Sequence, residues 1–119
     1  MKGKKSLDEL PIIVSIQPGI ANEKPLLFMA PEEATEWQLK DVIKYVKSEG
    51  DEIIENREDE AILSRIQRET TSDYQIVIKG EGVSPESSLK DYLEVKSLED
   101  GRKYYWVEMI VAAPQEGGF

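Results

Sequence analysis

The segment 91–113, "DYLEVKSLEDGRKYYWVEMIVAA", constrains the fold most, because it contains two strand patterns separated by a turn signal. β-Branched and aromatic residues occur on both sides of Asp100-Gly101. A hairpin is therefore predicted. Its connection is either a two-residue turn at Asp100-Gly101 or a three-residue loop at Glu99-Asp100-Gly101, which places the glycine at the left-handed position of a bulged turn.

The length of this loop decides which side chains share a face of the hairpin. The two-residue turn pairs Val95 with Trp106, whereas the three-residue loop pairs Val95 with Tyr105. We predict the three-residue loop because it gathers the larger apolar set onto one face, where that set can be buried. This face comprises Leu93, Val95, Tyr105, Val107, Met109 and Val111.

The opposite face of the hairpin alternates aromatic and charged residues, and it is the main candidate site. Tyrosine and tryptophan contribute most to the energetics of protein interfaces. The candidate partner-binding residues are Tyr92, Tyr104, Trp106 and Ile110. Two interpretations stay open: an exposed apolar patch that binds a partner, or a surface that the N-terminal arm, the second helix, or lysine and glutamate side chains cover.

Three further strands are expected outside the hairpin. The runs "PIIVSIQPG" (11–19) and "PLLFMA" (25–30) are short, apolar and bounded by prolines, and we expect them to pair with each other. The third run lies in "SDYQIVIKGEG" (72–82), where Tyr74, Ile76 and Ile78 alternate with the residues between them. The following "GEGVSPESS" (80–88) is expected to be a loop.

Two helices are expected in the middle of the chain. The first spans 31–50, with Pro31 at its first position, a core-facing stripe at i, i+3, i+4 and i+7, and Gly50 as its stop. The second runs to about Arg68, and Asn56 with Asp59 three residues later resembles a capping arrangement.

Together these elements predict an α+β fold in a single domain over 7–113, in the order ββααβββ. Its mainly antiparallel sheet of about five strands has two helices packed on one face. Residues 1–6 are expected to form a flexible basic arm and residues 114–119 a loose C-terminal tail. A length of 119 residues suits one hydrophobic core.

The charge of the chain restricts its partners. The net charge is −9, with three lysines in the first five residues, so the rest of the chain carries 12 basic and 24 acidic side chains. Such a surface repels phosphate backbones and anionic membranes, which argues against direct nucleic-acid or membrane binding. A basic protein partner remains compatible with it, and the acidity also serves solubility.

The absence of histidine and cysteine excludes most enzyme mechanisms and the usual ligands of transition metals. No cofactor is predicted. Two acidic runs offer carboxylates for a hard metal or for acid–base chemistry, but their expected position in first helical turns is sufficient to explain them. These carboxylates are Glu32, Glu33, Glu36, Glu58, Asp59 and Glu60.

A serine–lysine pair is the other enzymatic candidate. Ser87 and Lys90 match the Ser-x-x-Lys spacing of such nucleophile pairs. The same stretch fits a helical turn that Ser88 and Asp91 open before the hairpin, which is the interpretation we favour.

No apolar run approaches the roughly 18 residues that a membrane span needs, and acidic residues interrupt any signal-peptide pattern. A cytoplasmic location is therefore expected, in a microbe or in an infected host.

The function expected from the sequence is that of a non-enzymatic protein-binding module: an interaction, inhibitor or assembly factor of a regulatory or viral kind. It would use its acidic surface and its aromatic sheet face. The alternatives are an acidic nucleic-acid mimic that blocks a basic DNA-binding protein, a carboxylate/metal-dependent or Ser-Lys hydrolase, and a structural subunit that forms a homo-oligomer through its C-terminal hairpin.

Overall fold

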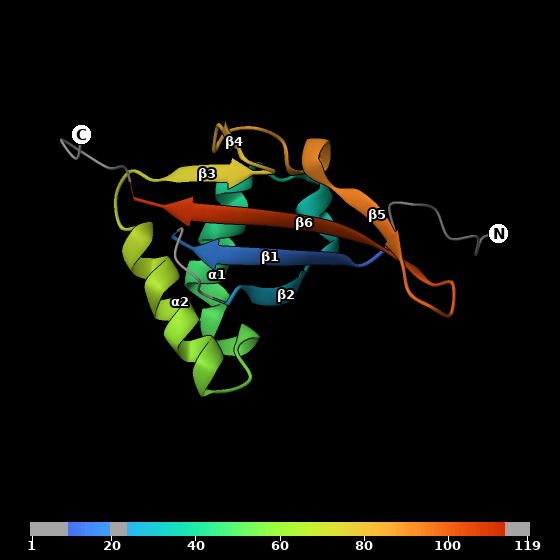
Figure 1. Cartoon of the computed structure of the whole chain (residues 1–119), viewed down its shortest axis with the longest axis horizontal. Helices are drawn as coiled ribbons and strands as arrows, with labels where there is room; N and C mark the ends of the chain where they lie inside the picture. Colours follow the sequence, from blue (N-terminus) through green and yellow to red (C-terminus); the bar gives the residue numbers. More distant parts are fainter. Residues whose placement is uncertain (1–9, 20–23, 114–119) are drawn as a thin grey trace.

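The computed structural model describes residues 10–19 and 24–113, which form a two-layer α+β domain (Figure 1). The expected arm at 1–6 and tail at 114–119 lie outside the described residues. The elements are β1 (Ile12–Pro18), β2 (Leu26–Ala30), η2 (Glu32–Glu36), α1 (Leu39–Ile53), α2 (Arg57–Glu69), β3 (Gln75–Ile78), β4 (Glu81–Val83), η3 (Leu89–Tyr92), β5 (Glu94–Ser97) and β6 (Lys103–Ala112). In this part of the chain, no helix is long and apolar enough to cross a membrane.

The central strand of the sheet is β6, which Figure 1 shows between β1 and β3. The strand order is β2-β1-β6-β3-β4, and β5 also pairs with β6. All pairs are antiparallel except β1 with β6, which run parallel over seven register positions from Ile12↔Tyr105 to Pro18↔Val111. The mainly antiparallel sheet is confirmed.

The predicted hairpin register is confirmed. Val95 lies opposite Tyr105, and the Leu98 backbone N–H donates to the Arg102 carbonyl at 2.7 Å, which closes the three-residue loop. Gly101 has φ +91°, a left-handed conformation that glycine adopts without steric cost.

The first arm of the hairpin is shorter than predicted. It begins at Glu94, because Leu89 turns into the core in η3 and its N–H donates to the Trp37 carbonyl at 2.8 Å. Val95 was predicted to be buried but is 48% exposed, since this end of the sheet extends beyond the helices (Figure 1). Along the same edge of β6, beyond the end of β5, β3 pairs with the C-terminal part of β6.

The helix predicted over 31–50 is in fact two helices. η2 covers Glu32–Glu36, and α1 starts only at Leu39. A cap at Gln38 favours the start of α1 at Leu39, because the Gln38 N–H donates to Asp41 Oδ2 at 3.0 Å. The N–H groups of Leu39 and Lys40 then donate at 2.8 Å to the carbonyls of Ser87 and Pro85. Chain segments far apart in the sequence thus cap α1 together.

Gly50 was predicted to stop the first helix, but α1 continues to Ile53. The glycine has a different role, because it lies where α1 approaches α2. A methyl group at Gly50 would be 2.6 Å from Leu63 Cδ2 and 3.0 Å from its Cδ1. The small residue therefore allows the two helices to pack closely.

The predicted loop at 80–88 contains a short strand. β4 pairs with β3 through a two-residue turn at Lys79-Gly80, and both turn residues have positive φ, at 55° and 82°. Type I′ hairpin turns require this conformation.

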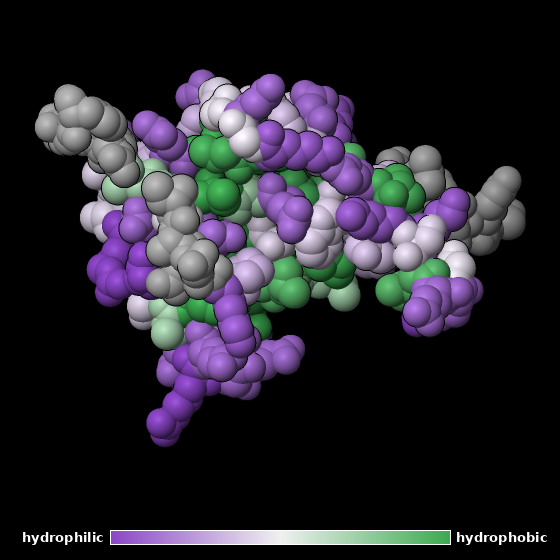
Figure 2. Space-filling model, in the orientation of Figure 1, coloured by the Kyte–Doolittle hydropathy of each residue, from purple (hydrophilic) through white to green (hydrophobic). Residues whose placement is uncertain are grey.

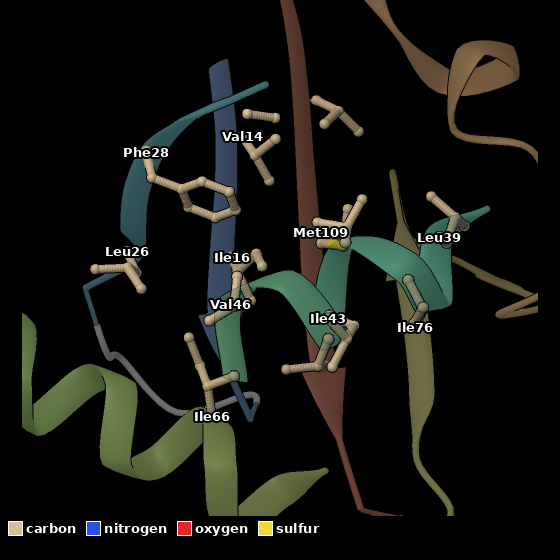
Figure 3. Packing of buried hydrophobic residues seen from close by; sticks show 14 of the residues in the cluster. Val14, Ile16, Leu26, Phe28, Leu39, Ile43, Val46, Ile66, Ile76 and Met109 are labelled. Atoms are coloured by element: carbon tan, nitrogen blue, oxygen red, sulfur yellow. The ribbon is translucent and has the colours of Figure 1, made fainter. Parts of the chain in front are cut away.

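One hydrophobic core fills the space between the sheet and the helices. Alternate residues of β1, β2, β3 and β6 point into it, and α1 and α2 contribute their apolar stripes. Figure 3 shows Ile43 and Val46 of α1 packing among Ile16, Met109 and Ile76 of the sheet. Both α-helices therefore lie on one face of the sheet, as predicted.

The helix contact at Gly50 leads to a stability prediction. Gly50→Ala should lower the free energy of unfolding by about 1 kcal/mol, because crowding Leu63 costs more than the better helix propensity of alanine contributes. In a Leu63→Ala background the same change should raise it by about 0.5–1 kcal/mol, since only the propensity effect remains. Urea unfolding of the four proteins measures both effects, and an equal effect in both backgrounds would contradict the contact.

Candidate functional site

Within residues 10–19 and 24–113, no helix packs on the face of the sheet opposite α1 and α2, and we call this face the open sheet face. Figure 2 views this face and shows apolar side chains in green between hydrophilic ones in purple. Strand alternation assigns to it Ile13, Ser15 and Gln17 of β1, Leu27 and Met29 of β2, Val77 of β3, Glu94 and Lys96 of β5, and Tyr104, Trp106, Glu108 and Ile110 of β6.

The strand register orders these side chains into rows across the sheet. One row runs from Met29 through Ile13 to Trp106, and a second connects Gln17, Ile110 and Val77. Met29 is 62% exposed and Leu27 53% exposed, so the β2 end of this face presents apolar surface directly to solvent.

The aromatic pair on β6 is held in a defined geometry. Tyr104 and Trp106 are two residues apart on the same face, and their rings meet edge to face with centroids 6.4 Å apart at 85°. The Lys96 ammonium lies 5.8 Å from the centroid of the Trp106 ring, within the range of a cation–π contact. Both aromatic side chains are half-buried, which leaves part of each ring accessible to a partner.

Charged side chains border the aromatic pair. Glu94, opposite Trp106 in the register, forms an ion pair with Lys79 from the β3–β4 turn. The hydrogen bond and the charge of Lys79, with a smaller contribution from Lys96, lower the pKa of Glu94 below its ordinary value. The Glu94–Lys79 ion pair therefore lies at the border of the aromatic pair, with Lys96 on the same face.

At one end of the open sheet face lies a groove of about 470 Å³, which we call the hairpin groove. The turn between β5 and β6, the start of β1 and the end of β2 form its walls. It is lined by Leu10, Pro11, Ile13, Met29, Leu98, Arg102, Lys103 and Tyr104. The hydrogen bond from the Tyr105 N–H to the Pro11 carbonyl, at 2.8 Å, fixes β1 to β6 beside it.

Of the four candidate binding residues, the structure brings three together. Tyr104, Trp106 and Ile110 share the open sheet face. Tyr92 lies apart from them, because it belongs to η3 and packs half-buried against the core.

Sequence reasoning missed Ile13, Leu27, Met29 and Val77 on this face. A signal was present for β2, where Leu27 and Met29 alternate with buried residues. Their position beside Trp106 depends on the parallel pairing of β1 with β6, which no local pattern encodes.

The two acidic runs have structural roles at helix starts. Glu32 and Glu33 lie in the first turn of η2, and Glu58, Asp59 and Glu60 lie in the first turn of α2, where the helix dipole favours negative charge. Within residues 10–19 and 24–113, no group of three or more histidine, cysteine, aspartate or glutamate side chains is placed to hold a metal.

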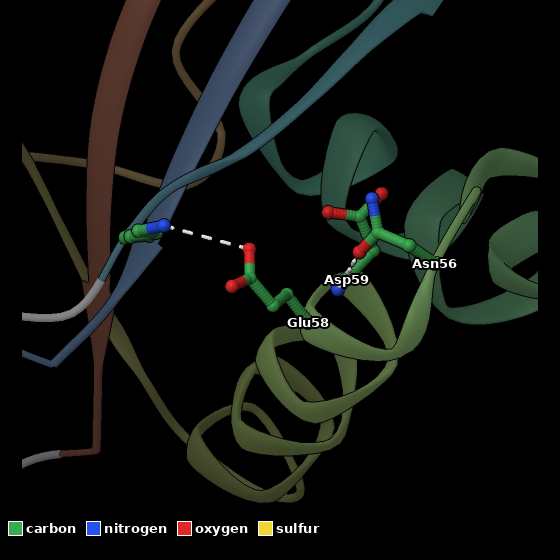
Figure 4. Close-up of polar contacts among 4 residues, drawn as sticks. Asn56, Glu58 and Asp59 are labelled. Atoms are coloured by element: carbon green, nitrogen blue, oxygen red, sulfur yellow. Dashed lines mark hydrogen bonds and ion pairs between the residues drawn. The ribbon is translucent and has the colours of Figure 1, made fainter.

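Two side-chain hydrogen bonds cap the start of α2, and Figure 4 shows the one between Asn56 and Asp59. Asn56 Oδ1 accepts from the Asp59 N–H at 2.9 Å, and Asp59 Oδ2 accepts from the Glu55 N–H at 3.1 Å. Glu58 forms an exposed ion pair with Lys24 at 3.4 Å. The predicted capping arrangement of Asn56 and Asp59 is confirmed.

The serine–lysine candidate lies in a turn. The Ser87 N–H donates to the Ser84 carbonyl at 3.0 Å, and Ser88 immediately precedes η3, so the predicted helical turn before the hairpin is present. Between the side chains of Ser87 and Lys90, both described by the structure, there is no hydrogen bond.

Comparisons of this chain with protein-family models, with curated proteins and with solved structures found no match.

The structural role of the second acidic run can be tested at its cap. Asn56→Ala should lower the free energy of unfolding by about 1 kcal/mol, because the first N–H groups of α2 lose an acceptor. Asn56→Ser is the matched control, since serine restores an acceptor and should cost only a few tenths of a kcal/mol. Urea unfolding distinguishes them, and equal stability of the alanine and serine variants would contradict the cap.

Proposed function

We propose that this protein is a non-enzymatic protein-binding module, and that the open sheet face is its binding surface. The observation that supports this proposal is the apolar row from Met29 through Ile13 to Trp106, which no helix or strand of the described chain covers. In this row Met29 is exposed, and Ile13 and Trp106 are partly exposed. Soluble monomers seldom leave large contiguous apolar patches accessible to solvent unless the patch binds something.

The side chains on this face suit the centre of a protein interface. Trp106 and Tyr104 combine a large contact area with few rotatable bonds, and their edge-to-face contact restricts them further. Little conformational entropy is then lost when a partner packs on them. Met29 and Leu27 add apolar surface on β2, which β1 separates from these two rings.

The distribution of charge separates this surface from the acidic part of the chain. Residues 31–70, which contain both α-helices, carry 12 acidic and 6 basic side chains, whereas residues 74–113 carry 7 acidic and 5 basic ones. A nucleic-acid mimic would need its carboxylates on the contact face. Here they are concentrated on the helical layer, where they favour solubility and orient an approaching partner.

The proposal predicts that Trp106→Ser abolishes partner capture while the fold persists. Tagged protein would be incubated with native extract, and the captured proteins identified by mass spectrometry at low and at high salt. Because the contact is mainly apolar, we expect capture by the parent protein to persist at high salt. Val95→Ser is the matched control, since Val95 is exposed on the other face of β5 and should leave capture unchanged.

Urea unfolding of each variant separates binding from folding. A Trp106→Ser protein that folds and captures the same partners as the parent would contradict the proposal. So would an unfolded Trp106→Ser protein together with a Tyr104→Ser protein that folds and binds normally. Salt-sensitive capture that survives both substitutions would instead indicate recognition by the acidic helical layer.

A further inference from the structure

Ser15 is a small polar residue in the middle of the open sheet face, and larger side chains surround it. The register places it on β1 between Leu27 of β2 and Glu108 of β6. Although it lies on the open sheet face, Ser15 is only 4% exposed, because its side chain is shorter than those of its neighbours. It lines a groove of about 300 Å³, which we call the Ser15 groove.

The lining of the Ser15 groove combines apolar and polar groups. Val77 of β3 and Ile110 of β6 are register partners and supply apolar surface. Glu108 and the Lys79-Gly80 turn supply charged and backbone groups. Apolar surface with a small number of polar groups is the usual composition of a site that holds one ligand group in a fixed orientation.

Two polar side chains of the groove have no partner among the residues that the structure describes. The Ser15 hydroxyl forms no hydrogen bond there, and the Glu108 carboxylate forms neither a hydrogen bond nor an ion pair. The two residues are register partners on the same face, so their side chains lie next to each other. Buried hydroxyl groups normally have a hydrogen-bond partner, so these adjacent acceptors are available to a ligand that donates.

The charges around the groove leave Glu108 as the unmatched one. Lys79 also lines the groove, but its ammonium forms the ion pair with Glu94. Lys96 lies two residues beyond Glu94 on β5, farther from Glu108, and its ammonium lies over the Trp106 ring. The unmatched charge has the same sign as the net charge of the chain, −9. Local and long-range electrostatics therefore both favour a cationic group at this site.

We propose that the Ser15 groove binds an arginine side chain of the protein partner. The guanidinium donates to the Glu108 carboxylate and to Ser15 Oγ, because its planar fork of N–H groups serves two neighbouring acceptors at once. The methylene groups of the arginine pack against Val77 and Ile110. The inference rests on the proposed function and specifies the chemistry of the partner at the centre of the open sheet face.

Two blocked peptides test this directly: acetyl-Phe-Gly-Arg-Gly-Phe-amide and the same peptide with citrulline in place of arginine. Citrulline has nearly the same shape as arginine but no charge. In an extended peptide the two phenylalanines share the face of the central side chain and can contact the apolar part of the open sheet face. Binding to the full chain is measured by two-dimensional NMR titration at about 0.15 M salt, which screens long-range attraction. The arginine peptide should bind about three- to fivefold more tightly and should shift the resonances of Ser15, Val77 and Ile110.

Two variants make the test specific to the groove. Glu108→Gln should abolish the preference for the arginine peptide, because the amide carries no charge. Glu49→Gln makes the same change of net charge on α1, which packs on the opposite face of the sheet, and should leave the preference intact. Both glutamates are exposed, so we expect both variants to fold, and their NMR spectra report this independently.

Four results would overturn the inference. They are equal binding of the two peptides by the parent protein, a preference that survives Glu108→Gln, an equal loss of preference in both variants, and resonance shifts confined to residues outside the groove. The third result would show that the net charge of the protein, and not the groove, attracts the arginine.

The capture experiment with Trp106→Ser is independent of these titrations. If that substitution abolishes capture but the peptides are not discriminated, the proposed function stands and the inference falls. If Glu108→Gln abolishes the preference but Trp106→Ser leaves capture unchanged, the groove binds arginine and the open sheet face as a whole is not the binding surface.

Discussion

The pairing of β6 with three other strands is the interaction on which the rest of this structure depends. Along one side β6 pairs with β1 over seven positions, and along the other it pairs first with β5 and then with β3. Strands on both sides thereby fix which side chains of β6 point to each face of the sheet. A shift of one residue in the register of β6 would expose Val107 and Met109 and bury Glu108. The same constraint that buries one face of β6 presents Trp106 on the other.

Much of this arrangement could be predicted from short stretches of the sequence, because interactions between residues close together in the chain determine it. Gly101 selects the three-residue loop, and the loop sets the register of β5 with β6. The start of α2 follows from the Asn56 cap. Two of the predictions that were wrong failed for an equally physical reason. The break before α1 and the role of Gly50 depend on contacts with the loop at 84–88 and with Leu63, which lie far away in the sequence.

Prediction of the candidate site from the sequence has the same limit: local patterns do not show contacts between distant segments. The two-residue period of β6 was sufficient to place Tyr104, Trp106 and Ile110 on one face. It could not show that Ile13 and Met29 extend this face, since the parallel partner of β6 lies some 90 residues earlier in the chain. Tyr92 was grouped with the aromatic residues by its spacing alone, but the burial of Leu89 places it in a helical turn against the core. The hairpin groove combines three separate segments and has no local sequence pattern.

Solvent access to the two faces of β6 tests the central claim most directly, namely that one face of the sheet is open. Methyl NMR spectra would be recorded with and without a soluble paramagnetic probe. We predict stronger relaxation of the Ile13, Met29 and Ile110 methyl groups than of those of Val107 and Met109, which are buried and alternate along β6 with the more accessible Trp106, Glu108 and Ile110. Equal protection of the two sets would show that the face is covered, and it would contradict both the open sheet face and the binding function assigned to it.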